Sequence, residues 1–196
     1  MYAVTNPFFP MKTAVKAFLC LCPVLLFGQT LKSEGDNLVI TFRPAGDGSG
    51  PPVTLTAKGR IVPPGQSDPA TDRKRRFVTA IVEANSSGVP GRILTLWRDS
   101  DKLDIEKKLT DQKMVDANRA LYSKIKVSEL LAYIEYGQYQ LLFVRHQGQG
   151  FTSMVRTYPV IEQEGRLLLT NALREDMVYT YLSSIFEREL GKLPAK

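Results

Sequence analysis

The sequence predicts an α+β fold: an N-terminal β-hairpin, two to three helices, then a curved antiparallel sheet and a C-terminal helix in a roll-like arrangement. Two patterns support this order. Apolar residues recur at helical spacing from residue 69 to residue 125, whereas residues 129–170 contain four strand-length segments rich in aromatic and β-branched side chains. Glycine-containing turns separate these segments. Short turns between successive strands indicate antiparallel pairing.

The hairpin is expected over residues 37–62. Apolar and polar residues alternate in Asn37–Arg43 and again in Pro52–Ile61, which is the pattern of strands with one buried face. Residues 44–51 between them are dense in glycine and proline, and this composition predicts the connecting loop. Residues 31–36 are mostly polar, and we expect no regular structure there.

The first helix is expected over residues 69–85. Asp68 is placed to cap this helix, Pro69 suits its first turn, and Gly88 is placed to end it. Pro90 then opens a second, shorter helix that continues through Trp97. These signals place the first two helices directly after the hairpin.

Two further helices are expected on either side of Thr110, and strands follow them. Residues 101–109 are helical at least in part, and the next helix presents an apolar face of Met114, Asn118, Leu121 and Ile125. The four strands cover residues 129–136, 138–146, 153–161 and 166–170. The last helix spans about residues 175–189, with one stripe formed by Val178, Tyr181, Leu182, Ile185 and Phe186.

Residues 1–30 have the features of a secretory signal peptide. Lys12 and Lys16 lead into an apolar run of eleven residues, 17–27, which is shorter than the ~20 apolar residues that a membrane-spanning helix needs. Cys20 and Cys22 raise the alternative of a lipid anchor, but both lie inside the apolar run rather than at its end. We therefore expect an exported chain, periplasmic or extracellular, with no transmembrane segment after cleavage.

Removal of this signal limits the chemistry that the rest of the chain offers. The formal net charge falls from +6 to +4, and the loss of both cysteines excludes disulfides, cysteine-ligated metals and thiol chemistry. We divide the remainder into a hairpin extension with its linker, residues 31–67, and a domain, residues 68–196. A chain of about 165 residues buries enough apolar surface to fold without cross-links.

Three segments carry a resemblance to a known family: the helix from Asp68, the short helix with Leu94–Trp97, and the closing hairpin Pro159–Thr170. In this order, residues 69–173 resemble the nuclear-transport-factor-2-like superfamily of conical α+β rolls. The resemblance implies a pocket inside the cone. The long last helix departs from the family's pattern, in which rolls often end on a strand, and in such a roll we expect it to cap the mouth of the cone and block the pocket. The 37–62 hairpin lies outside the family's pattern. The alternative is a different α+β layer sandwich built from the same elements.

The resemblance also implies candidate catalytic residues, because enzymatic members pair an Asp or His base with Tyr donors inside the cone. The first candidates here are His146, Asp99 and Tyr133, and the wider set also contains Asp104, Tyr136, Tyr139 and Tyr158. His146 is the one histidine in the sequence, so a structural zinc site lacks ligands, and we expect neither a metal nor a cofactor. Tyrosines on half-buried strands more often serve as core residues with hydrated hydroxyls.

The densest run of charge comprises Arg73, Lys74, Arg75 and Arg76, near the start of the first helix. Such a run attracts anionic polymers or membrane surfaces, which makes it a candidate anion-binding site. The alternative is an ordinary, solvated helix start. Nucleic acid is not an expected partner, because the chain is expected to be exported and no aromatic stacking pattern accompanies the run.

Three functions remain open at this point. The leading one is a non-catalytic exported domain that binds a partner protein or a small ligand on the concave face of its sheet. The alternative is a small isomerase, dehydratase or hydrolase that uses an Asp or His146, with a Tyr, in the cone pocket. The third is a self-associating subunit, a homodimer formed through its sheets.

Overall fold

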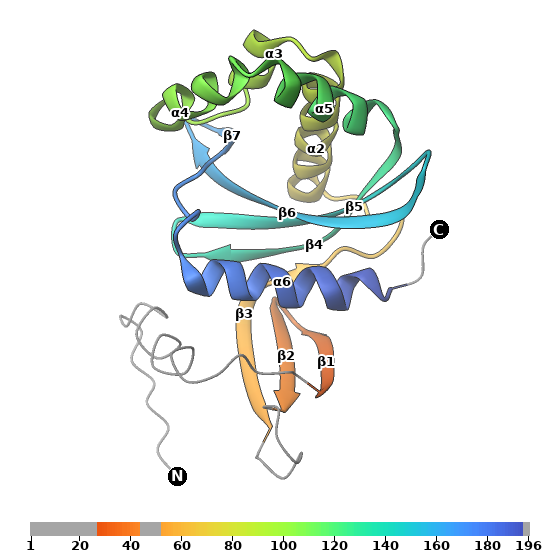
Figure 1. Cartoon of the computed structure of the whole chain (residues 1–196). Helices are drawn as coiled ribbons and strands as arrows, with labels where there is room; N and C mark the ends of the chain where they lie inside the picture. Colours follow the sequence, from red (N-terminus) through yellow and green to blue (C-terminus); the bar gives the residue numbers. More distant parts are fainter. Residues whose placement is uncertain (1–26, 44–51, 194–196) are drawn as a thin grey trace.

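The computed structural model describes residues 27–43 and 52–193. Its seven strands form one antiparallel sheet in chain order, β1 to β7. Helices α2–α5 lie between β3 and β4 in the chain and cover one face, whereas α6 packs on the other (Figure 1). The elements are β1 (Phe27–Glu34), β2 (Asn37–Arg43), β3 (Val53–Ile61), α2 (Pro69–Ser87), α3 (Pro90–Leu94), α4 (Asp99–Leu109), α5 (Gln112–Ser123), β4 (Ile125–Tyr136), β5 (Tyr139–Gly148), β6 (Phe151–Gln163), β7 (Arg166–Leu169) and α6 (Met177–Gly191).

The predicted α+β class and its order of elements are confirmed. N-terminal strands come first, helices follow, and the antiparallel strands β4–β7 and a C-terminal helix complete the chain. The sheet is not closed, because β1 and β7 do not pair with each other. The roll-like part of the expectation therefore corresponds to an open sheet. The loop at residues 44–51 and the first 26 residues of the expected signal peptide lie outside the described residues.

The N-terminal extension has a third strand that the sequence pattern does not indicate. β1 pairs with β2 through a two-residue turn at Gly35 and Asp36, in which Gly35 has a φ of 59°. The expectation of no regular structure at residues 31–36 is wrong, because this turn lets a mostly polar segment pair through its backbone. β1 also includes residues 27–30, the last four of the expected signal.

The helix signals are confirmed for α2 and need correction for its neighbours. The side chain of Asp68 accepts a hydrogen bond from the backbone N–H of Thr71 at 3.0 Å, and Gly88 ends α2 in the left-handed conformation. The second helix is shorter than expected: α3 ends at Leu94, and Trp97 forms a parallel bridge with Leu169 of β7. This bridge ties the helical layer to the edge of the sheet.

The buried face of α5 is displaced by one residue from the expected one. Val115 and Tyr122 are buried, whereas Met114 is 48% exposed. The expected face counted Ile125 as its last member, but Ile125 begins β4. Because the expected apolar stripe included a residue of β4, it gave the wrong set of buried residues for α5. The observed phase places Tyr122 on the buried face of α5, which is turned toward the sheet.

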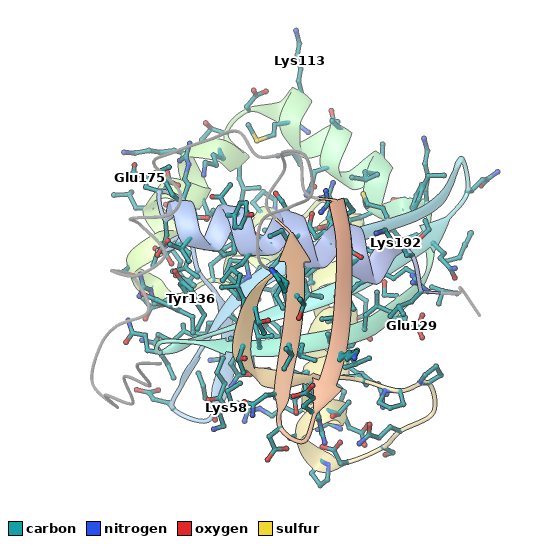
Figure 2. The ribbon with its side chains drawn as sticks, turned by 90° about the horizontal axis from the view of Figure 1, so that it is seen from below. Lys58, Lys113, Glu129, Tyr136, Glu175 and Lys192 are labelled. Carbon is teal, nitrogen blue, oxygen red and sulfur yellow. The ribbon has the colours of Figure 1, made fainter. Side chains whose placement is uncertain are left out.

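The sheet bends where β3 meets β4. The two strands pair only over Gly59–Ile61, and a Cβ at Gly59 would collide with the backbone of Tyr133 and Ile134. Beyond this contact β1–β3 turn away from β4–β6 and extend across α6 and beyond it (Figure 1). Figure 2 shows the same three strands from below, crossing α6. Leu38, Ile40 and Ala57 of these strands belong to the same core as α6.

The two faces of the sheet bury two separate cores. On β5 the side chains alternate, so Leu141 and Phe143 face α6 while Leu142 and Val144 face the helical layer. The position of α6 differs from the expected cap over the mouth of a cone, because α6 lies on the face opposite α2–α5. Its first turn is fixed by Tyr136, whose hydroxyl donates to Asp176 at 3.0 Å.

The outer edge of β6 is only partly covered by another strand. β7 pairs with Val160–Gln163, and in the described residues no strand pairs with this edge before Val160. Here Glu187 of α6 accepts hydrogen bonds from the backbone N–H and the hydroxyl of Thr157, at 2.8 and 2.6 Å. A cavity opens beside this part of β6.

Candidate functional site

A cavity of about 510 Å³ lies between the helical layer and the β6–β7 edge of the sheet. Its size falls within the usual range for small-molecule sites, roughly 300–1,000 Å³. Its walls come from α2, α3, α4, α5, β6, β7 and the segment after β7, and Tyr179 of α6 also contributes. Most of the lining is apolar: Ile81, Ile93, Trp97, Ile105, Leu109, Met114, Val115, Pro159 and Leu169.

Helix α5 forms one long wall of this cavity. Val115, Asn118 and Tyr122 recur at spacings of three and four residues, so they share one face. At 1.5 Å per residue this wall extends for about 10 Å. Asn118 is held by a hydrogen bond from its amide to the side-chain oxygen of Asn85 on α2, at 2.6 Å. This face of α5 therefore lines the cavity over about two helical turns.

Two tyrosines that line the cavity, Tyr122 and Tyr158, belong to a buried chain of hydrogen bonds. The hydroxyls of Tyr122 and Tyr158 lie 3.1 Å apart, and the Tyr158 hydroxyl lies 2.8 Å from Nε2 of His146. Nδ1 of His146 is 2.8 Å from the hydroxyl of Ser128, its cross-strand neighbour on β4. His146 is fully buried and does not line the cavity, whereas both tyrosines do.

The electrostatics of this chain favour neutral groups. Burial, and to a smaller extent the charge of Arg156, lowers the pKa of His146 to about 4. Burial raises the pKa of Tyr158. A proton transfer from Tyr158 to His146 would create the charged form of each group, and both charged forms are disfavoured. The chain of hydrogen bonds is therefore poorly suited to proton abstraction by His146 through Tyr158.

The structure does not bring the three expected catalytic candidates together. Asp99 is an exposed first residue of α4, paired with Lys102 at 2.6 Å, and it lines a different, more polar hollow. Tyr133 lies beneath the ammonium group of Lys74, 4.3 Å from its ring centre. Only His146 adjoins the cavity, through Tyr158.

Sequence reasoning included Tyr158 among several possible tyrosine donors without pairing it with His146, and it did not include Tyr122. The predicted buried face of α5 was displaced by one residue, so it contained Leu121 instead of Tyr122. The strand register pairs His146 with Met154 and Leu142 with Tyr158, so His146 and Tyr158 are not cross-strand neighbours. They meet only because two long side chains lean toward each other along the strands. The Asp111 cap fixes where α5 begins but not which of its faces is buried, so no local signal pointed to Tyr122.

The basic run on α2 is divided among separate contacts. Arg73 binds Glu162 at 2.9 Å, Lys74 is buried over Tyr133, and Arg75 binds Asp72 at 3.0 Å. Arg76 is exposed. Arg73 and Arg76 line one hollow together with Arg166 of β7, whereas Lys74 and Arg75 do not. Anion binding by this run stays a prediction.

In the described part of the chain, no three His, Cys, Asp or Glu side chains are grouped so that they could hold a metal ion. No helix in that part is long and apolar enough to cross a membrane. Comparisons with protein-family models, curated proteins and solved structures found no match to this chain.

Proposed function

We propose that this chain binds a small, largely apolar molecule in the cavity along α5 and does not catalyse a reaction on it. The observation that carries the proposal is the cavity itself, about 510 Å³, walled mostly by aliphatic side chains and Trp97 and also lined by Tyr122 and Tyr158. Apolar walls supply affinity, and a few fixed polar groups supply orientation. The neutral His146 holds the Tyr158 hydroxyl in place.

The enzymatic alternative has one observation in its favour, the hydrogen-bond chain that links His146 to the cavity. Two others weigh against it. Tyr158 separates His146 from the cavity, and Asp99 lies in another hollow. The depressed pKa of His146 and the raised pKa of Tyr158 also oppose the proton transfer that such a mechanism needs. Binding is the better supported function.

The relationship to the nuclear-transport-factor-2-like superfamily is kept as part of the proposal. In its support, helices α2–α5 precede β4–β7, cover one face of them, and leave a pocket between helices and sheet. Export of the chain, homodimer formation and binding of a protein partner stay predictions from the sequence.

The proposal is tested with N-phenylnaphthylamine, a neutral apolar dye that fluoresces in apolar surroundings. We expect saturable binding to the full chain with one dye per chain. Val115→Trp fills the cavity from α5 and is expected to abolish binding, whereas Ala117→Trp, on the exposed side of the same helix, is expected to preserve it. Near-ultraviolet circular dichroism checks that both variants are folded. Equal binding by two folded variants would overturn the proposal.

A further inference from the structure

The cavity has two unlike ends, and their difference points to a class of ligand. One end is closed by Tyr122 and Tyr158, which are 6% and 8% exposed. The other walls include two cationic side chains, Lys108 of α4 and Arg174. Arg174 is exposed and Lys108 is half-buried, so these charges lie at the solvent side of the cavity.

The acidic groups near this opening do not cancel its charge. Among the described residues that line the cavity, none is acidic. Asp104 lies outside the lining and accepts hydrogen bonds from Lys108 at 2.8 Å and from Asn171 at 3.1 Å. The hydrogen bond from Lys108, and the charge of Arg174 among the smaller causes, lowers the pKa of Asp104. One carboxylate therefore faces two cations.

A second carboxylate, Asp101, is also engaged elsewhere. Its Oδ2 accepts from the Thr170 hydroxyl at 2.8 Å and from the Asn171 backbone N–H at 3.1 Å, and its Oδ1 lies 3.3 Å from Arg98. In contrast, the guanidinium of Arg174 makes no hydrogen bond or ion pair within residues 27–43 and 52–193. It is available to a ligand at the opening.

We infer that the ligand is an amphiphile with one carboxylate and an apolar body, bound with its carboxylate at Lys108 and Arg174 and its body directed toward Tyr122. This inference rests on the proposed function. A guanidinium binds a carboxylate through two parallel hydrogen bonds, which a neutral head group does not reproduce. The reverse orientation would bury the carboxylate among aliphatic side chains, where an ion loses its hydration.

The test compares three amphiphiles with the same ten-carbon chain: decanoate, decanol and decylamine. Each is used at neutral pH and low salt to displace N-phenylnaphthylamine from the full chain. We expect decanoate to displace the dye at about tenfold lower concentration than decanol, as one charge-assisted hydrogen bond provides, and decylamine to be the weakest. High salt is expected to reduce the preference, because the cations are near the surface.

Two variants test whether the preference for decanoate over decanol depends on Arg174 and Lys108. Arg174→Gln and Lys108→Gln are expected to weaken decanoate by about tenfold or less while leaving decanol unchanged. Lys107→Gln, an exposed neighbour on α4 that does not line the cavity, is the matched control and is expected to change neither. All three substitutions are near the surface, so the variants are expected to fold.

The possible results separate this inference from the proposed function. The inference of a carboxylate ligand is overturned if decanoate and decanol displace the dye equally, or if Arg174→Gln weakens both to the same extent. Either result leaves the proposal of apolar binding in place. Failure of every amphiphile to displace the dye, together with dye binding that survives Val115→Trp, overturns both.

Discussion

The two faces of the sheet differ in how completely they are filled. On the α6 face, Phe143 and Phe186 stack at 4.9 Å, and both are at most 1% exposed. On the face covered by α2–α5, the packing leaves the 510 Å³ cavity and a buried chain of polar side chains. A full apolar core contributes most to stability, whereas a hollow with fixed polar groups costs stability and provides a binding place. The α6 face is therefore expected to contribute more to stability, and the other face holds the cavity in which we propose binding.

The largest expected effect comes from the filled face. Phe186→Ala removes a buried ring and leaves a new cavity, so we expect a loss of about 3–5 kcal/mol in the free energy of unfolding. Ile105→Ala on the hollow face is expected to lose about 2 kcal/mol, near the lower end for such changes, because its side chain already lacks neighbours on one side. Urea denaturation measures both values. Equal losses would show that the hollow face is as tightly packed as the other.

The next largest effect is a pH dependence that belongs to the hollow face. His146 has an ordinary pKa of 6.5, and its folded value is about 4. Between these values the unfolded chain binds more protons, so the contribution is complete above about pH 6.5 and is lost as the pH falls to about 4. The expected loss is about 3 kcal/mol.

Urea denaturation across this pH range measures the loss, with His146→Gln as the comparison. The variant is expected to lack most of the slope between pH 6.5 and 4 that the unchanged chain shows. A slope that persists unchanged in His146→Gln would assign it to carboxylates instead.

The smallest effect distinguishes the two tyrosines of the hydrogen-bond chain. Tyr158→Phe leaves Nε2 of His146 and the Tyr122 hydroxyl without the partner they have in the unchanged chain, and we expect a loss of about 1–3 kcal/mol. Tyr122→Phe removes only one hydrogen bond and is expected to cost about 1 kcal/mol. Thermal unfolding of the two variants ranks them. The opposite ranking would place the centre of the chain at Tyr122.

The sequence predicted the elements better than their phase. The Asp68 cap, Gly88, and the glycine turns after Tyr136, His146 and Glu162 act locally, so each marks an element wherever the chain packs. β1 was not predicted, because its formation depends on pairing with β2 rather than on a pattern in its own side chains. The buried face of α5 depends on the sheet beneath it, which the stripe alone does not define.

The candidate site was harder to predict than the fold. His146 was identified because it is the one histidine in the sequence, but its partners were not. Ser128, Tyr158 and Tyr122 come from three different elements, and their meeting requires the register of β4–β6 and the phase of α5 together. The cavity is a shape left between packed helices and strands, and no local pattern encodes it.

The contact between Glu187 and Thr157 also has a consequence for how separate molecules meet. An exposed strand edge is a template on which another chain can add a strand and begin aggregation. On β6 the Thr157 N–H is occupied by the Glu187 carboxylate, and Pro159 has no N–H to offer. To pair here, an incoming strand would have to displace the Glu187 side chain from Thr157, and it would find no N–H donor at Pro159. This helix thus protects the edge that β7 leaves uncovered.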